Sequence, residues 1–105
     1  MLIPLSELPY YAVIFTSVLK PDHPGYHEMA GHIEALSKQG QGYLGMDSAR
    51  SEIGISVSYW KTEADILRWK QQTDHLLAQK LGKEKWYECY TVRICKVERQ
   101  YDYSS

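Results

Sequence analysis

The stretch Ile53–Leu81 constrains the fold more than any other part of the chain. Its first part, Ile53–Trp60, alternates between two kinds of side chain, which predicts a β-strand with two different faces. Thr62 follows, with Asp65 three residues later, and this capping-box-like pair predicts a helix that runs to Leu81 before Gly82. A strand that leads directly into a helix is therefore the central unit of the predicted fold. One face of the strand carries Ile53, Ile55, Val57 and Tyr59, and the other carries Gly54, Ser56, Ser58 and Trp60.

Three further strands are predicted around this unit. Tyr10–Ser17 and Trp86–Val97 are rich in β-branched and aromatic residues, which is typical of strands. Both runs are apolar on both sides, so we expect each strand to be covered on both faces. Gly42–Arg50 is a third and weaker strand, because it contains several glycines.

One further helix is predicted between the first two strands of the chain. Asp22 is its expected N-cap, and the helix ends near Lys38, where Gly40 stops it. The element order is therefore β-α-β-β-α-β, the ferredoxin-like arrangement of an α+β fold. Right-handed crossovers put both helices on the same face of one antiparallel sheet. The apolar residues at helical spacing in this helix are Tyr26, Met29, Ala30, Ile33 and Leu36.

A chain of 105 residues is large enough for one domain, so residues 1–105 are predicted to form a single one. The predicted sheet keeps one face without helices, although two of its strands are apolar on both sides. A second copy of the chain, packed sheet against sheet, is the simplest cover for that face, so we expect a homodimer. The alternative is a monomer that exposes an aromatic-rich face, which would promote aggregation.

Charge and composition exclude several classes of function. The net charge is −1, and Lys and Arg are interspersed with Asp and Glu, so no basic stripe predicts nucleic-acid binding. No apolar run approaches the roughly 18 residues of a membrane span. The N-terminal segment is interrupted by Pro4, Glu7 and Pro9, unlike a signal peptide. We expect a cytoplasmic protein, and Cys89 and Cys95 fit this because they lie too far apart on one strand to form a disulfide.

Two motifs resemble binding signatures but lack the required context. Gly40–Gly45 matches G-x-G-x-x-G, yet it follows a helix and precedes a strand, the reverse of the dinucleotide-binding order. His27 and His32 are five residues apart and therefore lie on different sides of a helix, unlike a pair of zinc ligands. We interpret His23, His27 and His32 as three solvent-exposed histidines on the polar side of this helix. The sequence predicts neither a nucleotide site nor a metal site.

The helix after Thr62 has an unusually wide apolar side, which Leu67 and Ala78 extend. A helix that only covers a sheet needs an apolar stripe about 100° wide, so the extra width predicts a second contact, such as a pocket wall or a partner subunit. Nine Tyr and three Trp against one Phe also suit a half-polar pocket or an interface. His75 lies outside the stripe. The stripe consists of Ile66, Trp69, Thr73, Leu76, Leu77 and Leu81.

Val57–Ala64, with Trp69 and His75 beyond it, makes the chain resemble the antibiotic biosynthesis monooxygenase family, whose members are dimeric α/β barrels. The resemblance covers nearly the whole chain and is strongest over Gly45–Arg50 and Ile53–Gln79. It implies a monooxygenase that uses molecular oxygen on a small aromatic or phenolic substrate. It also implies a pocket between the second helix and the sheet, and no separate cofactor.

The resemblance also implies which residues form the site. His75 and Trp69 are expected to be catalytic: the histidine accepts the proton of a phenol, and the substrate ring stacks on Trp69 or Trp60. An arginine and tyrosine hydroxyls are expected to stabilise the resulting anion. The expected substrate-binding residues are Trp60, Tyr59, Tyr11, Arg50 and Arg93.

Two alternatives remain open on the sequence. One is a dimeric module whose aromatic pocket binds a small apolar ligand without turnover. The other is haem binding or degradation, because the haem-degrading branch of the family is similar around Trp60 and Trp69. That branch needs an iron-ligating histidine where this chain has Gln79, and an asparagine, which this chain lacks altogether.

Overall fold

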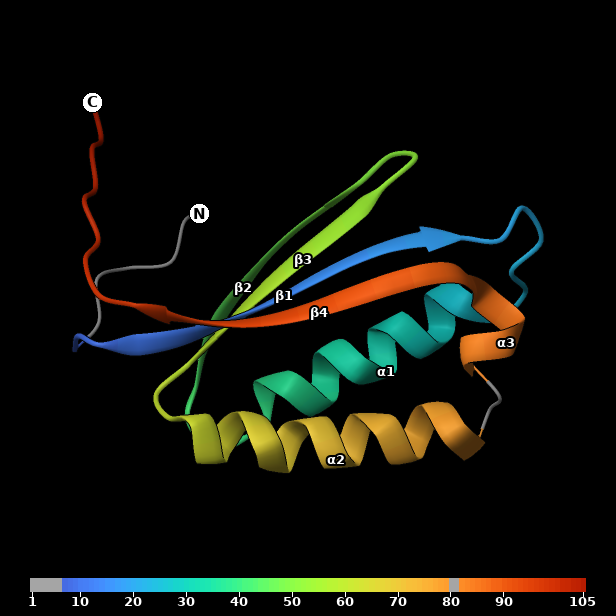
Figure 1. The fold of residues 1–105 in the computed structure, drawn as a ribbon, viewed down its shortest axis with the longest axis horizontal. Coiled ribbons are helices and arrows are strands. Elements are labelled where there is room, and N and C mark those ends of the chain that lie inside the picture. Colours follow the sequence, from blue (N-terminus) through green and yellow to red (C-terminus); the bar gives the residue numbers. More distant parts are fainter. Residues whose placement is uncertain (1–6, 80–81) are drawn as a thin grey trace.

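The computed structural model describes residues 7–79 and 82–105, and its elements follow the predicted order with one short helix added (Figure 1). None of the helices in this part of the chain combines the length and the apolar character that a membrane span requires. The elements are β1 (Tyr10–Leu19), α1 (Tyr26–Lys38), β2 (Tyr43–Arg50), β3 (Gly54–Trp60), α2 (Glu63–Gln79), α3 (Gly82–Trp86) and β4 (Tyr87–Val97).

The four strands form one antiparallel sheet in the order β2-β3-β1-β4, which confirms the ferredoxin-like βαββαβ fold. Strand β1 lies inside the sheet and pairs with both β3 and β4, so that Val13 stands between Ser58 and Ile94. A register shift between Tyr43 and Gly45 interrupts the pairing of β2 with β3. Such a shift is typical of a β-bulge, and it lies at Gly45, the glycine of β2.

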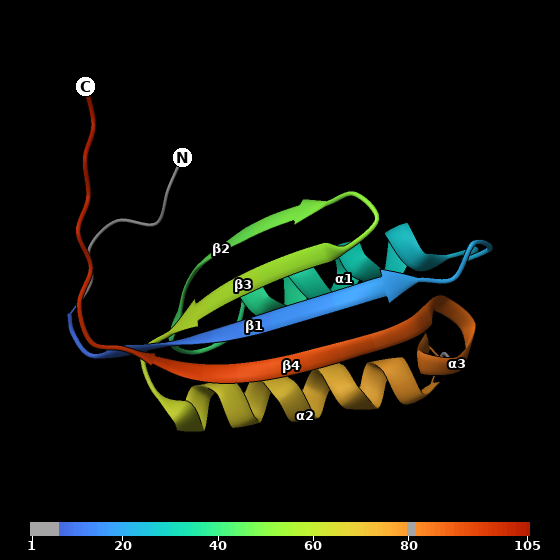
Figure 2. The same ribbon diagram turned by 45° about the horizontal axis from the view of Figure 1, so that its top comes forward.

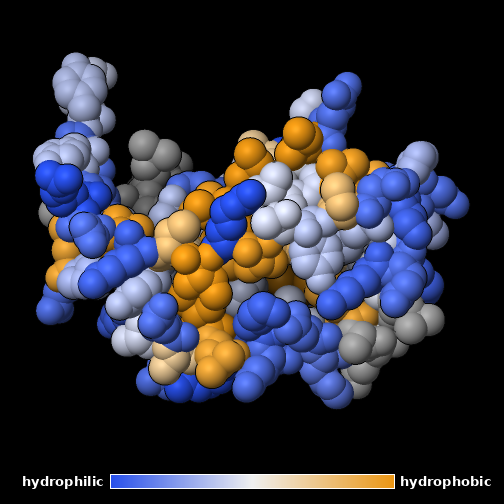
Figure 3. Space-filling view, viewed as in Figure 1, coloured by the Kyte–Doolittle hydropathy of each residue, from blue (hydrophilic) through white to orange (hydrophobic). Residues whose placement is uncertain are grey.

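Helices α1 and α2 cover the same face of the sheet, as both views of the ribbon show (Figures 1 and 2). Trp60 of β3 packs against Ile66 of α2, so the side of β3 that carries Trp60 and Ser58 faces the helices. Because neighbouring side chains on a strand alternate, Val57 and its partner Ile14 point to the other face. No helix of the described ranges covers that other face. In the space-filling view, apolar side chains gather over the middle of the molecule, where the strands pass (Figure 3).

Two apolar clusters hold the helices against the sheet. The first surrounds Trp60, whose side chain is fully buried where β3 ends. The second surrounds Trp86, whose indole Nε1 donates a hydrogen bond of 2.8 Å to the carbonyl of Pro24. The two clusters lie at opposite ends of α2 and together fix its position. Val13, Trp60 and Ile66 form the centre of the first cluster, and Met29, Leu77 and Trp86 form the centre of the second.

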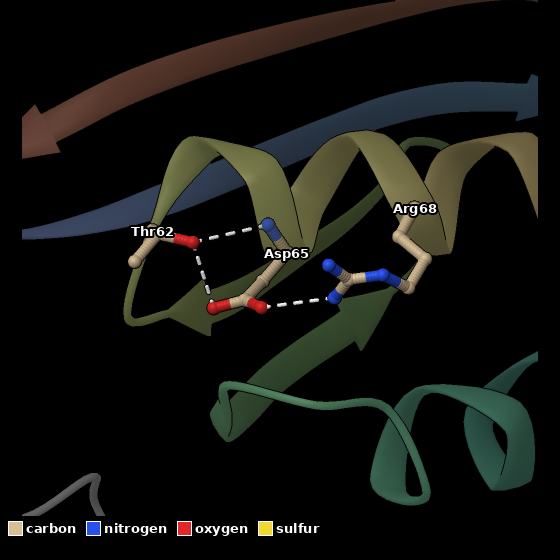
Figure 4. A network of polar contacts seen from close by, with 3 residues as sticks. All are labelled: Thr62, Asp65 and Arg68. Atoms are coloured by element: carbon tan, nitrogen blue, oxygen red, sulfur yellow. Dashed lines mark hydrogen bonds and ion pairs between the residues drawn. The ribbon is translucent and has the colours of Figure 1, made fainter.

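The start of α2 is fixed by the predicted capping pair (Figure 4). Thr62 Oγ1 accepts a hydrogen bond of 3.1 Å from the backbone N–H of Asp65 and donates one of 2.8 Å to the Asp65 carboxylate. Arg68 Nη1 binds the other carboxylate oxygen of Asp65 at 3.1 Å. Asp65 also lies against Gly42, where a Cβ atom would overlap its carboxylate. The cap therefore connects α2 to the turn before β2.

The structure differs from the prediction at two helix ends. Helix α1 begins after Gly25, which has φ 84° and makes no side-chain cap, so the expected N-cap at Asp22 is wrong. Gly82 does not simply stop a helix but begins α3, which also contains Trp86, so the last strand starts at Tyr87. The predicted end of the second helix at Leu81 lies outside the described residues.

Two alanine substitutions should have opposite effects on stability. Gly42 has φ 81°, so Gly42→Ala should cost about 1–2 kcal/mol for the backbone alone, and more because Asp65 must move. Gly31 lies inside α1 with open space around it, so Gly31→Ala should add about 0.5–1 kcal/mol. Urea denaturation followed by circular dichroism measures both changes. A Gly42→Ala protein as stable as the wild type would contradict the close contact with Asp65.

Candidate functional site

A cavity of about 410 Å³ lies between the sheet and the two long helices. Its floor consists of residues from β1, β2 and β3, and its walls come from α1, α2 and the start of β4. Volumes of this size are typical of sites for small organic molecules. The lining residues that matter for its chemistry are Phe15, Tyr26, His27, Arg50, Ser56, Ser58, Trp69, Thr73 and Tyr87.

The cavity exists because the helix-facing side of β3 is small. Gly54, Ser56 and Ser58 occupy that side, and only Trp60 at the end of the strand is large enough to reach the helix beyond it. The β2–β3 hairpin also rises away from the helices at its far end (Figure 1). The space beneath the helices is therefore closed near Trp60 and widens toward Gly54.

The closed end is aromatic and fixed by hydrogen bonds. The rings of Trp60 and Trp69 are 5.3 Å apart at an interplanar angle of 39°. Trp69 Nε1 donates a hydrogen bond of 2.7 Å to Ser37 Oγ, which itself donates to the carbonyl of Ile33 at 2.9 Å. Trp60 Nε1 donates one of 2.9 Å to Ser58 Oγ. Because both indole N–H groups have acceptors, Trp69 presents apolar ring surface at this end of the cavity, and the buried Trp60 supports it from the core.

The wide end carries a positive charge. The guanidinium of Arg50 donates a hydrogen bond to Ser17 Oγ and lies 5.6 Å from the centre of the Tyr26 ring, a cation–π distance. Gly54 gives it room, because a Cβ atom there would overlap the guanidinium. No aspartate or glutamate of the described ranges forms an ion pair with Arg50. Glu34 also lines the cavity, but it pairs with Lys38 at 3.2 Å.

Tyr87 adds a neutral hydroxyl beside this charge. Burial, together with the neighbouring Tyr26, raises the pKa of Tyr87 above its ordinary value, although the charge of Arg50 opposes the shift. The hydroxyl therefore keeps its proton well beyond neutral pH and can donate a hydrogen bond, but it cannot act as a base there. Its ring packs edge-on against Phe15 at 5.7 Å and against Tyr26 at 6.0 Å.

Thr73 contributes a buried hydroxyl from α2. Its residue is 8% exposed, and its Oγ1 has no hydrogen-bond partner among the described residues. A buried hydroxyl without a partner costs about 1–3 kcal/mol, so a fold does not keep one for stability. Thr73 lines the cavity, so a molecule bound there can supply the missing partner once the side chain turns its buried Oγ1 toward the cavity.

The residues expected from the sequence fall into four places. Trp69 and Arg50 line the cavity, at its two ends. Trp60 and Tyr11 belong to the core cluster that closes the cavity and are not among its lining residues. Tyr59 lies on the helix-free face, where its hydroxyl donates a hydrogen bond of 3.2 Å to Asp47.

The other two expected residues also lie away from the cavity. Arg93 pairs with Ile14, so it lies on the helix-free face of the sheet. His75 is exposed on α2 and is not among the lining residues, in agreement with its position outside the apolar stripe. The side chain of Gln79, which replaces the haem ligand of the haem-degrading branch, lies outside the described residues.

The sequence did not identify several lining residues. His27 was interpreted as solvent-exposed, and it is exposed, but it also contributes to the wall of the cavity beside Tyr26, with the two rings 5.3 Å apart. Helical spacing predicts Thr73 on the apolar side of its helix but gives it no role. The signal that could have located the cavity is the run of small residues opposite Ile55 and Val57 on β3. No group of three possible metal ligands occurs in the part of the chain that the structure describes.

Comparison with known proteins gives one sequence relative and several similar folds. The chain is 44% identical over 96 residues to the uncharacterised protein YqjZ of Bacillus subtilis, covering 90% of this chain and 84% of the relative. No family model matches. A Nitrosomonas europaea protein assigned to the antibiotic biosynthesis monooxygenases has a similar structure, with a TM-score of 0.64, 18% identity, and coverage of 89% of this chain and 93% of that one. SnoaB of Streptomyces nogalater, a cofactor-independent oxygenase, has a TM-score of 0.61 with 7% identity over 90% of this chain and 96% of its own.

Proposed function

The chain belongs to the same family as YqjZ of Bacillus subtilis and has the fold of antibiotic biosynthesis monooxygenases, and from this premise we propose that it is a cofactor-independent monooxygenase. Its substrate is a small aromatic phenol that binds between the helices and the sheet. The observation that carries the proposal is the cavity itself, which has an indole at one end and cationic and hydroxyl groups at the other. Aromatic walls with a few polar groups are what a phenol requires.

The reaction needs a base, and His27 is the one histidine among the described residues that lines the cavity. We assign the base to His27 and not to His75, because His27 lines the cavity. Histidine commonly accepts protons from substrates near neutral pH. Removal of the phenolic proton gives a phenolate, which is electron-rich enough to pass one electron to molecular oxygen. The neutral hydroxyl of Tyr87 is suited to donate a hydrogen bond to the phenolate.

The remaining steps balance without any added reductant. The phenoxyl radical and superoxide combine to form a carbon–oxygen bond at the ring position opposite the phenol, giving a peroxide. Cleavage of its oxygen–oxygen bond, with loss of the ring hydrogen, leaves a quinone oxygen and releases the other oxygen as water. One phenol and one oxygen molecule thus give one quinone and one water, and all four electrons that reduce the oxygen come from the phenol.

Oxygen uptake tests this assignment. With 1-naphthol, 1-hydroxy-2-naphthoate and 1-hydroxyanthracene as substrates, the wild-type protein should consume oxygen faster than buffer and form the quinone. His27→Ala should lower the rate by about 100-fold or more, as expected for a lost general base. Trp69→Phe should mainly raise KM, because it removes stacking surface.

Two matched histidine variants complete this experiment. His32→Ala changes an exposed histidine of the same helix and should leave the rate unchanged, and His75→Ala should do the same. If the rate of oxygen uptake falls strongly in His75→Ala and not in His27→Ala, His75 is the base and the assignment to His27 is wrong. Absence of oxygen uptake with all three substrates would contradict the monooxygenase and favour a binding module without turnover.

We also propose that the protein is a homodimer in which the helix-free faces of two sheets pack together. Ile14 and Val57 share this face, and Ile55 of the same strand is 47% exposed in the single chain. Apolar side chains on a face without a covering layer favour association with a second sheet.

Sedimentation measures this directly. The wild type should sediment at twice the chain mass of 12.2 kDa, and Val57→Lys should shift it toward the single mass by placing a charge in the interface. Leu67→Lys is the matched control, because Leu67 is 59% exposed on α2, away from that face. A wild type that sediments as a monomer, or a Val57→Lys dimer as stable as the wild type, would contradict the proposal.

A further inference from the structure

The cavity has two chemically different ends, and this polarity determines what fits. The closed end is built by Trp69 over Trp60, with the ring centres 5.3 Å apart, and both indole N–H groups are already bonded within the protein. The wide end is built around Arg50. A ligand that fills the cavity therefore meets apolar aromatic surface on one side and a cation on the other.

Arg50 is held in place without being neutralised. Ser17 and the ring of Tyr26 position its guanidinium, and the absence of a side chain at Gly54 gives it space. These contacts restrict the arginine without removing its charge, and no carboxylate of the described ranges pairs with it. The planar guanidinium matches a carboxylate, which it binds through two parallel hydrogen bonds.

Arg50 is exposed in the free protein, and a ligand that fills the cavity would exclude water from one side of its guanidinium. The walls there are largely apolar or aromatic, and an ionic interaction strengthens where less water screens it. Glu34 is the acidic residue on the cavity wall, and its ion pair with Lys38 offsets its repulsion of an anion. The wide end therefore favours an anionic group.

Thr73 supplies a second and independent point of recognition. The residue lines the cavity, and its buried Oγ1 has no partner in the described part of the chain. Along α2 it lies one turn after Trp69, so it borders the region between the aromatic end and the wide end. If the side chain turns its hydroxyl toward the cavity, a ligand oxygen that lies away from the anionic group can satisfy it.

We propose that the natural ligand of this cavity is a hydroxylated aromatic carboxylate. Its carboxylate binds Arg50, its ring system extends toward Trp69, and an oxygen distant from the carboxylate bonds to Thr73. A phenolic hydroxyl next to the carboxylate would then lie at the end of the cavity that His27 and Tyr26 share. The inference rests on the proposed function for the use of this cavity, but it concerns which molecule binds and not whether it is oxidised.

Isothermal titration calorimetry in oxygen-free buffer tests the carboxylate. The probes are 3,7-dihydroxy-2-naphthoate and its methyl ester, which differ in charge and hardly in shape. The wild type should bind the acid at least about tenfold more tightly than the ester, as expected for a charge-assisted pair. Arg50→Gln should abolish this difference, whereas Arg99→Gln, which removes an exposed arginine beyond β4, should retain it.

A second variant keeps the charge but moves it. Gly54→Ala adds a methyl group where the guanidinium lies, so it should reduce the preference for the acid while leaving the net charge unchanged. If Arg50→Gln fails to fold, as judged by circular dichroism, Gly54→Ala carries the test. A preference for the acid that persists in the folded Arg50→Gln or in Gly54→Ala would overturn the inference. Failure of the wild type to bind either probe would overturn it as well.

Thr73 is tested with 3-hydroxy-2-naphthoate, which lacks the distant hydroxyl. The wild type should bind 3,7-dihydroxy-2-naphthoate more tightly than this analogue, and Thr73→Val should remove the difference without lowering the melting temperature. If the wild type and Thr73→Val prefer 3,7-dihydroxy-2-naphthoate over 3-hydroxy-2-naphthoate by the same factor, the role of Thr73 is overturned. These binding measurements exclude oxygen, so they are independent of the reaction. If the protein prefers the acid but consumes no oxygen in the separate oxygen-uptake assay, only the proposed reaction is contradicted. If it consumes oxygen with neutral phenols but shows no preference for the acid, only the proposed carboxylate ligand is contradicted.

Discussion

Helix α2 rests on the sheet through the contact of Trp60 with Trp69 and Ile66, at the point where β3 ends. Trp60 is fully buried, and the residues that precede it on the same side of β3 are small. One large side chain therefore sets the distance between helix and sheet, and the small side chains leave the space between them unfilled. At the other end of α2, the cluster around Trp86 also packs the helices against the sheet. The helices are therefore fixed on both sides of the cavity, which prevents its collapse.

The same arrangement explains the distribution of polar groups. Indole N–H groups at the closed end find acceptors within the protein, as buried donors normally do. The hydroxyl of Thr73 does not, and Arg50 faces the cavity without an ion-pair partner in the described ranges. Groups that the fold leaves incompletely satisfied mark the places where a ligand contributes. The chemistry assigned to the cavity depends on these two groups and on His27.

The sequence predicted the order of the strands and long helices, because alternation, helical spacing and the Thr62–Asp65 cap are local signals. It could not tell which face of β3 meets the helices, since Ile55, Val57 and Tyr59 compete with the single Trp60 for the core. It also missed α3, because five residues are too few for a periodic pattern. The sequence also did not show how each helix is rotated about its axis relative to the sheet. It therefore could not tell whether His27 or His75 lies beside the cavity. Tertiary packing decides these points.

The central claim is that the space between helices and sheet is a ligand site with a cationic and an aromatic end. A crystal structure of the protein with bound 3,7-dihydroxy-2-naphthoate tests it most directly. The carboxylate should lie within hydrogen-bonding distance of the Arg50 guanidinium, and the ring system should extend toward Trp69, with the 7-hydroxyl on Thr73 Oγ1. A ligand bound on the helix-free face of the sheet, or bound in the cavity with its carboxylate directed away from Arg50, would contradict it.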